Sequence, residues 1–154
     1  MNTETTDYDL LLQQAKALLS TENDIIANAA NLSSLLYFNL SEVNWIGFYF
    51  YHADKNELVL GPFHGQPACT RIPVGNGVCG TAFAQQKTQR VDDVHQFEGH
   101  ITCDTNSQSE VVVPFQTDKV AGVLDIDSPT IKRFGEAEQG FFESTIRVFL
   151  ASTG

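Results

Sequence analysis

The chain has 154 residues, which is the size of one ordinary domain, and 42% of them are hydrophobic, enough for a sizeable core. Charged residues make up 18%, and the formal net charge at pH 7 is −10. This acidic balance argues against binding to nucleic acid and to anionic membranes, because both need a surface rich in lysine and arginine. It leaves small ligands open, since a cationic ligand group needs only one or two local carboxylates.

The N-terminal residues and the cysteine count bear on the cellular compartment. The first seven residues are polar and acidic and lack the basic and apolar regions of a signal peptide. No apolar run approaches the roughly 18–20 residues of a membrane span. We therefore expect a cytoplasmic protein whose cysteines begin as thiols. Three cysteines cannot all pair within one chain, which favours catalysis or redox sensing over a structural disulfide framework.

Two amphipathic helices are predicted first, over residues 7–20 and 24–39, because apolar residues recur there at three- and four-residue spacing. Residues 43–51 then change to the alternation of a strand, and both faces of this strand are apolar. Trp45, Tyr49 and Tyr51 form one of these faces. We interpret the segment as a central strand that is buried on one side and lines a pocket on the other. A turn at 53–56 leads into a returning strand over 57–60, which we expect Gly61 and Pro62 to end.

The middle of the chain is less regular and contains all three cysteines. Residues 64–76 read as a loop that carries Cys69, and residues 77–86 read as a short helix that carries Cys79. A short strand is predicted over 88–91. Residues 92–107, which include Cys103, form a long irregular segment, and loops of this length in compact domains are usually functional or mobile.

A second hairpin, with strands over 110–116 and 120–127, precedes an amphipathic C-terminal helix over 135–152. Hairpin connections imply an antiparallel sheet, and helices at both chain ends must cover one of its faces. The predicted fold class is therefore α+β, a single domain over 1–154 with a central antiparallel β-sheet flanked by helices and the terminal helices packed on one face. A ligand site is expected on the opposite face.

Cys103 is the first candidate for chemistry. Its neighbours are small and polar, as expected for a loop, and loops held by a scaffold often carry reactive groups. A free thiol has a pKa of roughly 8.5, so a reactive cysteine needs help from its surroundings. His100 and backbone N–H groups of the loop are candidate helpers. From the residues alone, an inert packing cysteine remains the alternative.

Acidic residues form a second constellation. Asp125 and Asp127 are two residues apart on a strand and so point to one face, while Glu110 begins the neighbouring strand. Carboxylates beside apolar residues are costly unless they have partners. The partner can be the ammonium of an amino acid, or a carboxyl group can stay protonated and act as an acid. The alternative is a solvated sheet edge with ordinary carboxylates.

A zinc site is the competing constellation for the cysteines, built from all three with His95 or His100. No CxxC or HxxxH pair is present, so the ligand spacing is poor for zinc. We therefore expect no metal.

Five segments of the chain carry a family resemblance: PACTRIP at 67–73, GVCGTA at 77–82, GHITCD at 99–104, SEVVVP at 109–114 and GVLDIDS at 122–128. Together they resemble the free methionine-(R)-sulfoxide reductases, which are single GAF-domain enzymes. The resemblance extends from about Trp45 to the C-terminal helix. It implies a GAF-like domain that reduces free L-methionine-(R)-sulfoxide to L-methionine.

The resemblance also implies a division of labour among the cysteines, with Cys103 as the nucleophile, Cys69 as the resolving cysteine and Cys79 as an auxiliary thiol. A thiolate that attacks the sulfoxide becomes a sulfenic acid, and a second thiol then condenses with it to a disulfide. An external dithiol such as thioredoxin restores the enzyme, so no bound cofactor is expected.

The remaining predicted site residues form the substrate cradle. Glu110 and Asp127 are assigned to catalysis, and with Asp125 they also bind the substrate. Trp45 and Tyr49 offer an aromatic wall for the S-methyl group, because sulfur favours aromatic contacts; simple core packing is the alternative. Restriction to the free amino acid would follow if its ammonium and carboxylate ends were both buried.

A GAF module that senses a small ligand, or senses redox state through its thiols, is the alternative function. Such modules usually belong to longer chains with output domains, for which we expect no room here. The residues leave the oligomeric state open, a homodimer included, and they do not identify the physiological reductant.

Overall fold

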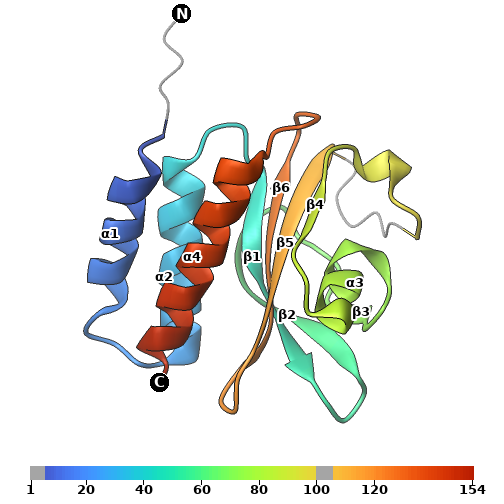
Figure 1. The fold of residues 1–154 in the computed structure, drawn as a ribbon. Coiled ribbons are helices and arrows are strands. Elements are labelled where there is room, and N and C mark those ends of the chain that lie inside the picture. The colour runs from blue at the N-terminus through green and yellow to red at the C-terminus, as the bar shows by residue number, and fades with distance from the viewer. Residues whose placement is uncertain (1–5, 100–105) are drawn as a thin grey trace, which may run out of the picture.

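The computed structural model describes residues 6–99 and 106–154. Within these residues, one six-stranded antiparallel sheet with strand order β3-β2-β1-β6-β5-β4 lies between helices on both of its faces (Figure 1). The elements in chain order are α1 (Tyr8–Leu19), α2 (Ile25–Asn39), β1 (Trp45–His52), β2 (Glu57–Gly65), β3 (Arg71–Pro73), α3 (Gly77–Gln85), β4 (Gln89–Val91), the 3₁₀ turn η1 (Val94–Gln96), β5 (Ser109–Gln116), β6 (Ala121–Ser128) and α4 (Glu136–Ser152).

The three long helices begin at side-chain caps. Asp7 accepts a hydrogen bond from the Leu10 N–H at 3.0 Å, and Asp24 accepts one from the Ala27 N–H at 2.8 Å. At the start of α4, Glu138 accepts from the Gly135 N–H at 2.7 Å. Such caps satisfy N–H groups that have no partner inside the helix. None of the helices in the described residues has the combined length and apolarity needed to cross a membrane.

The predicted end of β2 is wrong, because the strand continues through Gly61 and Pro62 to Gly65. The pairing with β1 explains why. Gly47 lies opposite Phe63, but Tyr49 lies opposite Leu60, so two residues of β2 face one residue of β1. This is the geometry of a β-bulge, which leaves a residue without a ladder partner and so tolerates the missing N–H of Pro62.

β3 is a second difference from the sequence prediction, which assigned residues 64–76 to a loop. Its three residues pair with the first residues of β2 and form one edge of the sheet. An ion pair between Arg71 and Glu57, with 2.6 Å between nitrogen and oxygen, connects the two strands.

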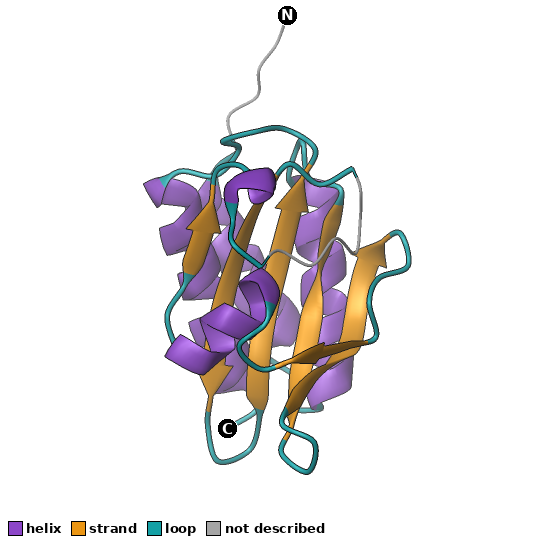
Figure 2. Cartoon of the chain, turned by 90° about the vertical axis from the view of Figure 1, so that its right-hand side faces the viewer, coloured by secondary structure: helices purple, strands orange, loops and turns teal. Residues whose placement is uncertain are grey.

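The sheet separates two layers of buried side chains. The helix-side core lies against α1, α2 and α4 (Figure 1) and includes Leu11, Leu19, Leu32, Leu36, Ile46, Phe48, Leu124, Ile126, Phe142 and Phe149. The α3-side layer lies on the opposite face, which faces the viewer in Figure 2, and contains Trp45, Tyr49, Leu58, Ile72, Val78, Cys79, Ala82, Phe83, Val112 and Val123. The prediction of an α+β fold with the terminal helices on one face of an antiparallel sheet is confirmed.

Candidate active site

Three carboxyl groups meet on the sheet face opposite the terminal helices. Glu110 of β5 lies directly opposite Asp127 of β6, and Asp125 precedes Asp127 by two residues on the same face. Leu124 and Ile126, which alternate with these aspartates, belong to the helix-side core. Glu110, Asp125 and Asp127 are exposed by only 7%, 5% and 9%. They therefore form a buried carboxyl cluster rather than a solvated sheet edge.

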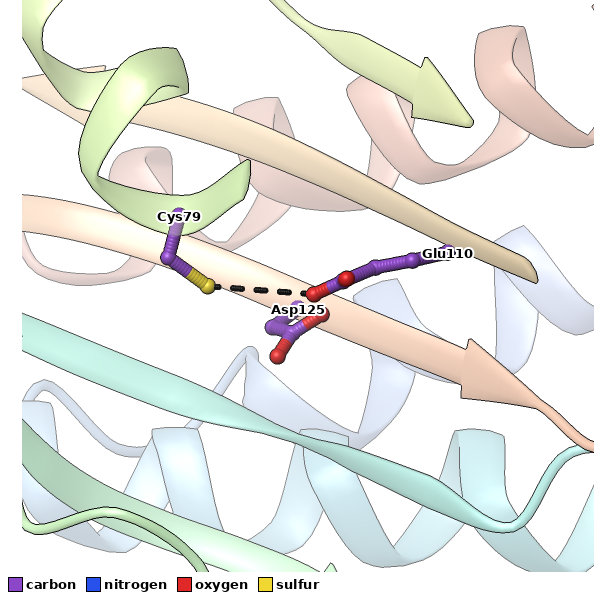
Figure 3. A group of neighbouring side chains, drawn as sticks. All are labelled: Cys79, Glu110 and Asp125. Carbon is purple, nitrogen blue, oxygen red and sulfur yellow. Dashed lines mark hydrogen bonds between the residues drawn. The ribbon is translucent and has the colours of Figure 1, made fainter. Parts of the chain in front are cut away.

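Cys79 completes this cluster from the helix above the sheet. It is the third residue of α3, is 5% exposed, and is a free thiol. Its side chain points from α3 toward Glu110 and Asp125 (Figure 3), and its Sγ donates to Glu110 Oε2 at 4.0 Å. The sequence motif that contains Cys79 gave no sign of this contact, which depends on how α3 packs on the sheet.

Burial changes the protonation of the cluster. Burial raises the pKa of Asp125 well above its ordinary value, and the negative charges of Asp127 and Glu110 raise it further. The pKa of the Cys79 thiol is also raised well above normal, first by burial and then by Asp125 and Glu110. The raised pKa favours the protonated form of Asp125, which is able to donate a proton. Cys79 stays in the thiol form, which is a weak nucleophile.

The cluster can also be considered as a metal centre. Cys79, Glu110 and Asp125 each offer one ligand atom, and these atoms lie within 4.8 Å of one another. This set differs from the constellation of three cysteines and a histidine that the sequence suggested. Cys79 and Asp125, whose pKa values are raised, would bind a divalent cation only after losing their protons. Binding of a substrate ammonium by these carboxyl groups remains a prediction.

Trp45 and Tyr49 of β1 form an aromatic pair beside the cluster. Each is 2% exposed, their rings stack with centroids 5.9 Å apart, and Trp45 also stacks on Phe63 at 5.2 Å. Their polar atoms form hydrogen bonds to the chain between β2 and β3. Trp45 Nε1 donates to the Gln66 carbonyl at 3.0 Å, and the Tyr49 hydroxyl donates to the Cys69 carbonyl, also at 3.0 Å. Both rings are thus available as an apolar wall, while their N–H and O–H groups are hydrogen-bonded to backbone carbonyls of the segment between β2 and β3.

The cysteines differ sharply in their surroundings. Cys69 is half-buried on the segment between β2 and β3 and is disulfide-bonded. Cys79 is buried and free. Cys103 and the neighbouring His100 lie outside the described residues, so the nucleophile and its helper remain predictions.

Comparisons with known proteins identify the family. Residues 21–148 match the GAF domain family. Protein YtsP of Bacillus subtilis is 54% identical over 94% of this chain and 91% of its own length. Free methionine-R-sulfoxide reductase of Escherichia coli is 51% identical, with 86% and 81% covered. A structure of fRMsr of Staphylococcus aureus in complex with substrate superposes with a TM-score of 0.92 at 47% identity over all of both chains. The chain therefore belongs to the GAF-domain family of free methionine-R-sulfoxide reductases, which are oxidoreductases.

Proposed function

We propose that this protein reduces free L-methionine-(R)-sulfoxide to L-methionine. The observation that carries the proposal is the burial of Glu110, Asp125 and Asp127 on one sheet face, beside the rings of Trp45 and Tyr49. Burying three carboxyl groups is costly unless a ligand offsets the cost. A free amino acid does so with its ammonium, and its S-methyl group suits an aromatic wall. The family of the chain supports the same substrate.

The first chemical step is the reduction of the sulfoxide by Cys103. Its thiolate, the sulfoxide and one proton give a Cys103 sulfenic acid and methionine, so the substrate sulfur gains the two electrons that Cys103 loses. The carboxyl cluster supplies the proton to the departing oxygen. Asp125 carries this proton before the substrate binds, because burial and the neighbouring carboxylates raise its pKa. Glu110 and Asp127 hold the ammonium and share in the proton transfer.

The second step regenerates the thiols. The Cys69 thiol condenses with the sulfenic acid, which forms a Cys69–Cys103 disulfide and releases water. The disulfide-bonded state of Cys69 and the free state of Cys79 support this choice of resolving cysteine. A dithiol protein such as thioredoxin then reduces the disulfide. A cycle that depends on thiols fits the reducing cytoplasm, where we expect the protein to work.

A turnover assay with three substrates tests the proposal. The reduced protein is mixed with thioredoxin or a small dithiol and with free R-sulfoxide, free S-sulfoxide or a peptide that contains methionine sulfoxide. We expect many molecules of methionine per enzyme from the free R-sulfoxide alone. Equal use of the peptide would contradict the assignment of the cluster to the free ammonium. Binding of the sulfoxide without any methionine would favour a sensor of the ligand instead.

A further inference from the structure

The segment that carries Cys69, residues 66–70, is the feature on which the inference rests. β2 ends at Gly65, whereas β3 begins at Arg71 beside Val59, near the start of β2. The chain must therefore travel back along six residues of strand, roughly 20 Å, in six residues. A largely extended segment, with bends at Gln66 and Thr70, covers this distance.

An extended segment of this kind cannot satisfy its own carbonyl groups, so other parts of the protein must do so. Three carbonyls around Cys69 are held by donors in the sheet beneath. Gln66 accepts from Trp45 Nε1 and Cys69 accepts from the Tyr49 hydroxyl, both at 3.0 Å, while Thr70 accepts from the Leu60 N–H at 2.9 Å. The backbone on both sides of the Cys69 thiol is thus fixed to β1 and β2.

Tyr49 is a dependable donor in this position. Its side chain is 2% exposed and its ring packs against Trp45, so the hydroxyl has little freedom to turn elsewhere. Burial raises the pKa of Tyr49 well above its usual value, and the charge of Asp125 raises it further. The hydroxyl therefore keeps its proton while the carboxyl groups beside it change charge.

We propose that Tyr49 is a positioning residue for the resolving step, with its hydroxyl holding the Cys69 carbonyl so that the Cys69 thiol can reach the Cys103 sulfenic acid. This inference rests on the proposed function. In the step itself the sulfur–sulfur bond forms, the sulfur–oxygen bond of the sulfenic acid breaks, and the thiol proton leaves with the oxygen as water. The ring of Tyr49 serves the substrate pocket and its hydroxyl serves the Cys69 segment.

The substitution Tyr49→Phe separates these two roles, because it keeps the ring and removes only the hydroxyl. In a single turnover of reduced protein, methionine release and disulfide formation are followed in the same quenched samples by chromatography and mass spectrometry. The loss of one hydrogen bond should slow disulfide formation roughly three- to tenfold relative to methionine release. Sulfenic acid trapped by dimedone should rise in parallel, and an excess of a small thiol should restore turnover.

Tyr51→Phe is the matched control. Tyr51 lies two residues further along β1, but its hydroxyl donates to Asn56 Oδ1 at 2.9 Å in the exposed turn and its ring stacks on Phe83. Removal of the Tyr51 hydroxyl should leave the ratio between the rates of disulfide formation and methionine release unchanged. The melting temperature of each variant is measured as well.

Disulfide formation as fast in Tyr49→Phe as in the wild type, with normal methionine release, would overturn the positioning role alone. Equal slowing of both steps with a lower melting temperature would also overturn it, since that is the result of a general structural role. Absence of methionine release from the wild type would instead contradict the proposed function, and this inference with it.

Discussion

The two faces of the central sheet use the same strands for different purposes. In β6, Leu124 and Ile126 are fully buried against the terminal helices, while Asp125 and Asp127 point into the α3-side layer with its thiol and aromatic rings. The helix-side core contributes stability through buried apolar area. The α3-side layer contains buried carboxyl groups, which lower the stability of the fold but are available to bind a ligand. Side chains on adjacent residues therefore differ in whether their loss should damage the fold or the chemistry.

The largest expected effect is on activity and comes from Asp125→Asn. The amide keeps the shape of the side chain but cannot act as an acid, and general acid catalysis usually contributes about 10²–10⁴-fold. We therefore expect kcat/KM for free methionine-(R)-sulfoxide to fall by roughly a hundredfold or more. Near wild-type kinetics in this variant, and in the matching amides at Glu110 and Asp127, would show that the cluster is not the acid.

Leu124→Ala tests the other face at the neighbouring position. Leu124 is completely buried, and truncation of such a leucine usually costs about 2–5 kcal/mol of unfolding free energy. Denaturant unfolding should show this loss, while kcat/KM per folded molecule should change by no more than a few-fold. A Leu124→Ala variant that stayed stable but lost its activity would contradict the assignment of stability to the helix-side face and of activity to the α3-side face.

Leu124→Ala should lower the stability of the fold, whereas Asp125→Asn should raise it by a smaller amount. Because the folded state raises the pKa of Asp125, the folded protein binds more protons than the unfolded chain above the ordinary value of 3.8. The stability contributed by this group is complete below that pH and is lost as the pH rises through the folded-state pKa. An asparagine at this position does not titrate, so the variant does not lose this stability as the pH rises.

The Asp125→Asn variant should therefore be more stable than the wild type at pH 7 by about 1 kcal/mol, or roughly 2–4 °C in melting temperature. Melting curves from pH 4 to pH 8 should show this gain growing with pH. A gain that shrank with rising pH, or a variant less stable throughout, would mean that Asp125 is charged in the folded protein.

The smallest effect is expected for Cys79→Ser. Serine retains an O–H that can donate to Glu110, and burial already keeps the thiol of Cys79 from ionising. Turnover with thioredoxin should stay within about threefold of the wild type, consistent with the loss of one hydrogen bond at most. A loss as large as that expected for Asp125→Asn would assign Cys79 a direct part in the chemistry.

The sequence predicted the parts of the site that depend on local periodicity. Alternation along β6 placed Asp125 and Asp127 on one face, and the hairpin around 117–119 placed Glu110 at the start of the neighbouring strand. The register that sets Glu110 opposite Asp127 is known from the structure. The course of β2 past Pro62 was not predictable in this way, because a bulge exists only in the pairing with β1. The contacts of Cys79 with Glu110 and of Tyr49 with Cys69 depend on tertiary packing, which residue spacing does not encode.

The most direct test of the account is a single-turnover count of methionine from the reduced protein without external reductant, in the wild type, Cys103→Ser and Cys69→Ser. The wild type should release about one methionine and acquire a Cys69–Cys103 disulfide that mass spectrometry detects. Cys69→Ser should also release one and then stop at the sulfenic acid, whereas Cys103→Ser should release none, because a serine hydroxyl is a poor nucleophile towards sulfur. Release by Cys103→Ser but not by Cys69→Ser would exchange the two roles. Normal release by both variants would contradict the roles assigned to Cys103 and Cys69, and normal release by Cys79→Ser as well would contradict thiol catalysis altogether.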